Sequence, residues 1–242
     1  PSLLHNYKKL KTSLFFLLLS FLLSSCNWFN TKPEIATVLT EHFDNNLYEN
    51  FDTVAYHLVF TEKMDELGAK LSNPKVTKAF YTANLNNPLL TTRFYTNGAL
   101  DTLKNYIESS NNDGFNPEVF HFTEISKLIS QLNANKFKTI NQFYPVLAEL
   151  EILTADALLR YTNYMKYGAV NPRKIYSRFY IETKRTDSLR MDSVLNSLDI
   201  VSILKDVQPK SKSYIDLKQQ LAFYKDSIGD EDNFEIKKIK LN

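Results

Sequence analysis

The chain has 242 residues, of which 43% are hydrophobic and 13% aromatic. This is the composition of a globular protein with an ample core; it excludes a disordered or fibrous chain and allows one or two domains. The net charge of +2 includes three lysines (Lys8, Lys9 and Lys11) in the acid-free first 25 residues, so the remainder is about neutral. A nucleic-acid-binding face needs clustered basic residues, and we therefore expect no nucleic-acid partner.

Residues 1–25 have the pattern of a secretory signal. After the lysines comes an apolar run, Leu14 to Leu23, which is far shorter than the roughly 20 residues that span a bilayer. The following Ser24-Ser25-Cys26 completes a sequence that resembles the bacterial lipobox, in which the cysteine is lipidated after cleavage. We predict a lipoprotein signal peptide over 1–25, lipidation of Cys26 and a tether over 26–33. The alternative is a short buried helix with an incidental cysteine.

Cys26 is the only cysteine, so the domain that follows it has no disulfide and no cysteine chemistry. The beginning of that domain is ambiguous. Residues 34–43 (EIATVLTEHF) favour a helix. Residues 51–60 (FDTVAYHLVF) carry the β-branched and aromatic side chains typical of a strand or an irregular edge.

Clearer helix signals begin at Ser72. Asn73 is a candidate N-cap and Pro74 suits the first helical position, which predicts a helix over 74–85 that ends at Asn87-Pro88. Residues 89–95 (LLTTRFY) are expected to form a short extended piece.

Two amphipathic helices are predicted next. The first, ending at Gly114, places four apolar residues on one face, and the second covers 123–136 (TEISKLISQLNANK). The apolar face of the first helix consists of Leu100, Leu103, Tyr106 and Ile107.

The longest predicted helix covers 139–167, with its regular part expected from Pro145 onward. It is apolar on nearly all sides, which is typical of a helix covered by several neighbours. It stops at Gly168, and Pro172 prevents its continuation.

Two or three shorter helices are predicted around 187–198, 199–208 and 212–228, with Asp187 and Asp199 as caps. Residues 229–242 (GDEDNFEIKKIKLN) lose the helical period and are expected to be extended. The predicted fold class is mainly α, a multi-helix bundle over 34–228 with at most a few short strands.

Acids in the long helix raise the question of glycoside cleavage by a carboxylate pair. Glu149 and Glu151 lie about 200° apart on a helix and do not face one another. Asp156 and Arg160, four residues apart, suit a modest surface ion pair. We therefore predict no catalytic residue here.

The histidines (His5, His42, His57 and His121) show no metal-ligand spacing, and the chain has no phosphate-binding glycine loop or serine nucleophile motif. No metal site and no cofactor are predicted. The many tyrosines and phenylalanines could line a glycan groove, but at helical spacing such residues more often form core.

Four motifs occur in this order: KAFYTANLNNPLL (78–90), LKNYIESSNNDGFNPEVFH (103–121), LAELEILTADALLRYTNYMKYGAVNPRK (147–174) and ILKDVQPKSKSYIDLKQQLAFY (203–224). Together they resemble the scaffold region of the large murein L,D-transpeptidases of Gram-negative bacteria. The third is similar to the family's long helix, which closes on Gly-x-Val-Asp-Pro. Three departures are Phe115 in place of leucine, Asn171 in place of aspartate, and the lack of tryptophan in PLLTTRF.

The resemblance implies a role in a larger enzyme that forms 3-3 cross-links with a cysteine of a Ser-His-Gly-Cys motif. This motif is not found in the chain. The expectation is a non-catalytic, lipid-anchored scaffold, either a fragment or a degenerate stand-alone form, with 229–242 leading toward catalytic and peptidoglycan-binding domains. It implies a periplasm-facing protein of the cell envelope, on the outer membrane. The alternative is a stand-alone envelope lipoprotein that binds peptidoglycan or a protein partner.

Overall fold

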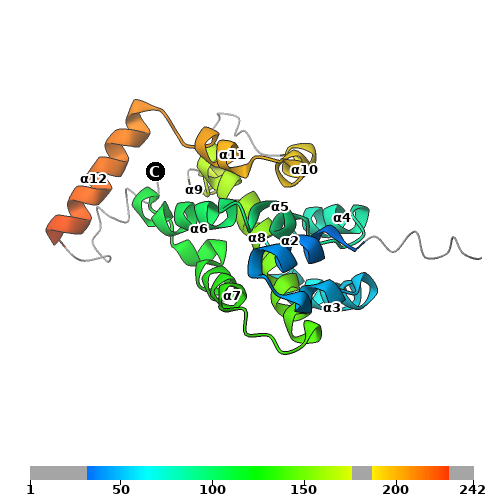
Figure 1. The fold of residues 1–242 in the computed structure, drawn as a ribbon. Coiled ribbons are helices and arrows are strands. Elements are labelled where there is room, and N and C mark those ends of the chain that lie inside the picture. Colours follow the sequence, from blue (N-terminus) through cyan, green and yellow to red (C-terminus); the bar gives the residue numbers. More distant parts are fainter. Residues whose placement is uncertain (1–31, 176–186, 229–242) are drawn as a thin grey trace, which may run out of the picture. The chain divides into compact units, whose positions relative to one another are not determined.

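The computed structural model describes residues 32–175 and 187–228. Within these ranges it contains helices and no strand, which confirms the mainly α, multi-helix fold class (Figure 1). No helix in these ranges is long and apolar enough to cross a membrane. The elements are α2 (Glu34–Phe43), η2 (Asn46–Asn50), α3 (Thr53–Leu67), η3 (Gly68–Lys70), α4 (Pro74–Ala83), α5 (Leu89–Phe94), α6 (Ala99–Ser109), η4 (Ser110–Asp113), η5 (Pro117–Phe120), α7 (Phe122–Ala134), α8 (Ile140–Tyr167), α9 (Pro172–Ile175), α10 (Ser188–Asn196), α11 (Ile200–Asp206) and α12 (Lys212–Ile228).

The described residues from Glu34 onward belong to one compact unit. The predicted signal peptide over 1–25, the lipidated Cys26, the tether as far as residue 31 and the tail over 229–242 lie outside the described residues. They remain predictions from the sequence.

Helix α3 replaces the strand or irregular edge expected over 51–60, so that expectation is wrong. Asp52 caps the helix, because its carboxylate accepts hydrogen bonds from Val54 N at 2.8 Å and Ala55 N at 3.2 Å. Burial of one face against α8 outweighs the weak helix preference of β-branched and aromatic residues. The buried residues recur at helical spacing: Tyr56, Phe60, Met64 and Leu67.

Helix α4 begins at Pro74, as predicted, but ends at Ala83, four residues before Asn87. Two consecutive residues with positive φ, Leu85 (54°) and Asn86 (53°), turn the chain there. The side chain of Asn73 does not cap the helix but donates to Ser72 Oγ at 3.1 Å.

Helix α5 occupies the segment 89–95 that was expected to be extended, so this expectation is also wrong. Its first amides, Leu90 N and Thr91 N, donate to the carboxylate of Glu151 in α8 at 2.6 Å and 2.9 Å. The capping group is 60 residues away in the sequence, so the local sequence gives no signal for this helix.

The two amphipathic helices predicted next are confirmed as α6 and α7. Leu100, Leu103 and Ile107 of α6 are buried, and Tyr106 packs against the core. Gly114 adopts a φ of 83° directly after η4, a left-handed conformation that glycine takes without a steric penalty.

Helix α8 is the element on which the bundle is assembled (Figure 1). It contacts α3, α4, α5, α7 and α10. It begins at Ile140, five residues before Pro145, so the expected start of its regular part is wrong. Pro145 lies in the second turn, where its missing N–H leaves only the carbonyl of Asn141 without a helical partner. The helix ends at Gly168, as predicted, with a φ of 80°.

Asp187 and Asp199 are confirmed as caps of α10 and α11, because their carboxylates accept from Arg190 N at 2.8 Å and Ser202 N at 2.9 Å. Helix α12 follows Pro209 and contacts η4. The end of the chain that the structure describes therefore lies against the turn between α6 and α7.

Leu150→Ala or Leu158→Ala should lower the free energy of unfolding by about 2–5 kcal/mol, because each leaves a cavity beside a fully buried helix. Both leucines are 0% exposed. Leu58→Ala, on the outer side of α3 at 71% exposure, is the matched control and should change stability by less than about 0.5 kcal/mol. Urea unfolding measures all three, and equal stability of the three variants would contradict the central position of α8.

Candidate functional site

Glu151 is a fully buried acid on α8. Its Oε1 accepts hydrogen bonds from Leu90 N and from the hydroxyl of Tyr81, and its Oε2 accepts from the amide and hydroxyl of Thr91, all between 2.6 and 2.9 Å. Burial raises the pKa of Glu151, whereas these four donors lower it, and the net direction is upward. Because each oxygen receives a backbone N–H, the hydrogen-bond pattern is that of a carboxylate. Its role is to hold α5 on α8.

Asp156 is a second fully buried acid on α8, one and a half turns further along. Its Oδ1 accepts from Ser72 N and Ser72 Oγ, both at 2.7 Å, and from Asn73 N at 3.3 Å. Its Oδ2 lies 2.9 Å from His121 Nε2 and 3.3 Å from a guanidinium nitrogen of Arg160. The pair with Arg160 was expected on the surface, and that expectation is wrong because α4, η5 and α7 cover the carboxylate.

The pKa of Asp156 lies below its usual value. Burial by itself raises this pKa, but hydrogen bonds from His121 and Ser72 and the charge of Arg160 outweigh the effect of burial. The carboxylate therefore stays ionised in the folded protein at neutral pH, and its charge holds the start of α4 and the start of α7 on α8.

These arrangements do not supply a general acid or a nucleophile. Every oxygen of Glu151 and Asp156 is occupied by structural donors, and the hydroxyl of Ser72 donates to Asp156 instead of to a histidine. Glu149, the third acid considered, forms a partly exposed ion pair with Lys63 at 3.6 Å. The structure thus assigns the acids of α8 to packing.

The described histidines are dispersed. His42 lies against the rings of Phe43 and Tyr95, His57 lies 3.4 Å from Asn87 Oδ1, and His121 contacts Asp156. In the part of the chain that the structure describes, no group of three or more His, Cys, Asp or Glu side chains could hold a metal ion.

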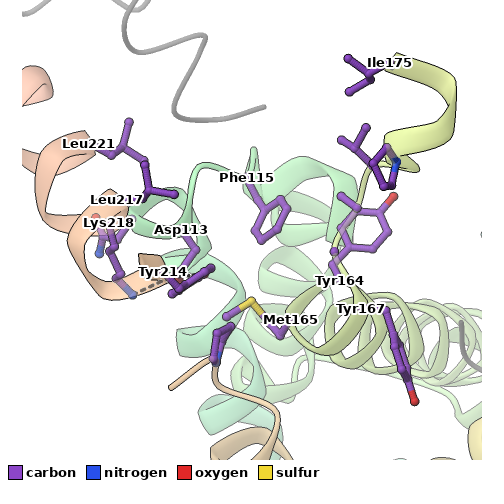
Figure 2. A pocket seen from close by; sticks show the side chains of 16 residues that line it. Asp113, Phe115, Tyr164, Met165, Tyr167, Ile175, Tyr214, Leu217, Lys218 and Leu221 are labelled. Atoms are coloured by element: carbon purple, nitrogen blue, oxygen red, sulfur yellow. Dashed lines mark hydrogen bonds and ion pairs between the residues drawn. The ribbon is translucent and has the colours of Figure 1, made fainter. Parts of the chain in front are cut away.

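In the part of the chain that the structure describes, most of the aromatic side chains that could have formed a glycan groove lie in the core, including Tyr48, Tyr56, Tyr81, Tyr144 and Tyr161. Four others surround a pocket of about 470 Å³ between the C-terminal end of α8 and helix α12, which we call the α8–α12 pocket. Figure 2 shows Phe115 and Tyr164 facing α12 across this pocket. The four aromatic residues are Phe115, Tyr164, Tyr167 and Tyr214.

The polar side of the pocket is one nearly buried carboxylate, Asp113, whose side chain is 4% exposed. Its Oδ1 accepts from Tyr214 OH at 2.8 Å and lies 2.6 Å from Lys218 Nζ (Figure 2). Burial and the neighbouring charge of Asp113 raise the pKa of Tyr214 well above its usual range. The phenol therefore remains a neutral donor, and Asp113 fixes α12 to η4.

No motif in the sequence predicts this site. Asp113 and Tyr214 are 101 residues apart, and each belongs to a segment that by itself predicts only a turn or a solvated helix face.

Glu151→Gln should lower the free energy of unfolding by about 1–3 kcal/mol although the side chains have the same shape, because the new amide group must face an N–H donor in either orientation. Glu149→Gln makes the same substitution two residues away and removes only the partly exposed pair with Lys63, which contributes less than about 1 kcal/mol. Thermal or urea unfolding at pH 7 measures both. Equal stability of the two variants would show that Glu151 does not hold α5.

Asp156→Asn should cost about 3–5 kcal/mol at pH 7, because it leaves Arg160 and His121 beside a neutral group. The folded pKa of Asp156 is depressed, so its contribution is present above the unfolded pKa of about 3.9 and is lost as pH falls through the folded value. The stability difference between the wild type and Asp156→Asn should therefore shrink below about pH 4. Urea unfolding between pH 3 and pH 7 measures this difference. The control is Asp101→Asn, at an exposed pair with Lys104, whose free energy of unfolding should differ little from that of the wild type at every pH.

Comparison with known proteins gives one match. A family model for a scaffold domain matches residues 75–221, which is more than half of the chain. No curated protein and no solved structure matches the chain. The matched residues begin at the second residue of α4 and end on α12 at Leu221, one of the residues that line the α8–α12 pocket. The chain therefore belongs to the scaffold domain family.

Proposed function

We propose that the chain is the non-catalytic scaffold part of a peptidoglycan L,D-transpeptidase, anchored by a lipid on Cys26. The observation that carries this proposal is the family match over 75–221, which contains the first three motifs that resemble the transpeptidase scaffold and the fourth as far as Leu221. In this proposal the full-length protein faces the periplasm from the outer membrane. Its catalytic and peptidoglycan-binding domains follow residue 242.

The hydrogen bonds of α8 give the motifs a common physical role. The first motif is bonded to α8 through Tyr81 and Glu151, and the second through His121 and Asp156. Arg160 of α8 also donates to the carbonyl of Val119 in the second motif. All of these bonds end on the third motif, which forms α8 itself.

The fourth motif is joined to the same frame at two points. Gln208 donates to the hydroxyl of Tyr161 in α8 at 3.1 Å, and Tyr214 donates to Asp113 in the second motif. A domain in which all four motifs are bonded to one buried helix is suited to hold a fixed shape. That property supports a scaffold that positions a separate catalytic domain.

A second candidate function is favoured by the α8–α12 pocket. Its aromatic side chains and its buried carboxylate suit a ligand with both apolar faces and hydroxyl groups, such as a glycan strand of peptidoglycan. In this reading the chain is a stand-alone envelope lipoprotein. Retention on purified sacculi, reduced by Tyr164→Ala, would favour it.

The coding sequence beyond Asn242 tests the main proposal. We expect an in-frame catalytic domain with a Ser-His-Gly-Cys motif, and replacement of that cysteine by alanine should remove the 3-3 cross-links that the protein makes, as measured by muropeptide analysis. A stop codon directly after Asn242 would overturn the transpeptidase proposal.

Cys26→Ser provides the matched control in the same cells. It removes the only thiol of this chain and leaves the downstream catalytic cysteine in place. We expect the protein to move from the membrane fraction to the soluble periplasmic fraction while it still forms 3-3 cross-links. Membrane retention of this variant would contradict lipidation at Cys26.

A further inference from the structure

The α8–α12 pocket has exposed apolar side chains on its wall. Val170 and Ile175, which line it next to α8, are 42% and 45% exposed, and Leu217 of α12 lines the opposite side. Figure 2 shows Ile175 and Leu217 on opposite sides of the opening. Its volume of about 470 Å³ lies within the range of about 300–1,000 Å³ found for ligand sites. Exposed apolar side chains around a cavity of this size mark a surface that another group covers.

We propose that the segment 229–242 of this chain binds in the α8–α12 pocket. Its sequence, GDEDNFEIKKIKLN, follows directly after α12, which itself forms one wall of the pocket. Phe234 and Ile236 are two residues apart, so in an extended chain their side chains point to the same side. These two side chains can cover the exposed apolar residues of the pocket.

The length of the segment permits this docking. Leu217 lies eleven residues before Ile228 on α12, which corresponds to about 16 Å along the helix axis. Phe234 follows Ile228 by six residues, and an extended stretch of that length reaches about 20 Å. Phe234 can therefore return to Leu217, and Ile236 can reach further, toward Ile175.

Charge favours the same occupant. Asp230, Glu231 and Asp232 open the segment. Cationic side chains flank the pocket: Lys218 on α12 is 42% exposed, and Arg173 on α9 is exposed. Lys218 is paired with Asp113 at 2.6 Å, so Arg173 is the cation that favours an acidic stretch crossing the rim over a basic one.

Docking of this segment would fix the direction in which the chain leaves the bundle. Whatever follows residue 242 would begin beside the end of α8. The inference does not depend on the transpeptidase proposal, since the binding of 229–242 can be measured in this chain whether or not a catalytic domain follows.

Disulfide trapping tests the docking, because Cys26→Ser leaves the full chain without any thiol. Leu217→Cys with Phe234→Cys places one thiol in the pocket and one in the segment. The control pair is Phe223→Cys with Phe234→Cys: position 223 is closer in sequence but 65% exposed and about 180° around α12 from Tyr214. We expect the 217–234 disulfide to form at least about tenfold faster than the 223–234 disulfide, because docking holds position 234 beside position 217. A free segment would instead bring its thiol to both positions at similar effective concentrations.

Val170→Arg, which places a charge at the pocket wall, should slow the 217–234 disulfide while the melting temperature stays unchanged. Equal rates for the 217–234 and 223–234 pairs would overturn the docking. So would a disulfide that joins two chains, because it would assign the pocket to a second copy, and so would failure of the 217–234 pair to form at all. Circular dichroism verifies that each variant is folded before the rates are compared.

Discussion

The structure depends on two carboxylates buried on a single helix. Glu151 and Asp156 are each 0% exposed, and each accepts several hydrogen bonds from segments far away in the sequence. Burial of an acid is costly unless its oxygens are fully bonded. The oxygens of these acids are fully hydrogen-bonded only when α4, α5 and α7 start at the right places on α8. Other arrangements of the helices would leave a buried carboxylate without donors, a cost that apolar contacts alone do not impose.

The same arrangement explains why the two buried acids do not act as a general acid or as a nucleophile. A general acid needs an accessible proton and a nucleophile needs a free lone pair, and the oxygens of Glu151 and Asp156 offer neither. The polar groups that reach an open cavity are instead at the end of α8, where Asp113 joins η4 to α12 through Tyr214 and Lys218. The hydrogen bonds that hold the helices together thus lie along α8. The surface suited to a ligand or a chain segment lies at the C-terminal end of that helix.

This division agrees with the properties expected of a scaffold domain. A scaffold must hold its shape while other parts of a protein move or react, and hydrogen bonds that all end on one buried helix achieve this. The connection through α12 is different in kind. It relies on the carboxylate of Asp113, on hydrogen bonds from Lys225 to Asn111 and on few buried side chains, of which Leu221 at 2% exposure is the most enclosed. A connection of this type can be strengthened by whatever occupies the α8–α12 pocket.

The sequence by itself determined the helical class, the two amphipathic helices α6 and α7, the long helix ending on Gly168 and the caps at Asp187 and Asp199. These features depend on periodicity and on groups within a few residues of one another. Only the tertiary structure decided that 53–60 and 89–94 are helical, that Asp156 is buried, and that Asp113 meets α12. In each case the deciding interaction joins residues far apart in the sequence: the burial of α3 against α8, a carboxylate that binds the first amides of α5, and a carboxylate that accepts from a distant tyrosine. Local helix and strand propensities do not predict such partners, because the interaction between them contributes free energy only after folding has brought them together.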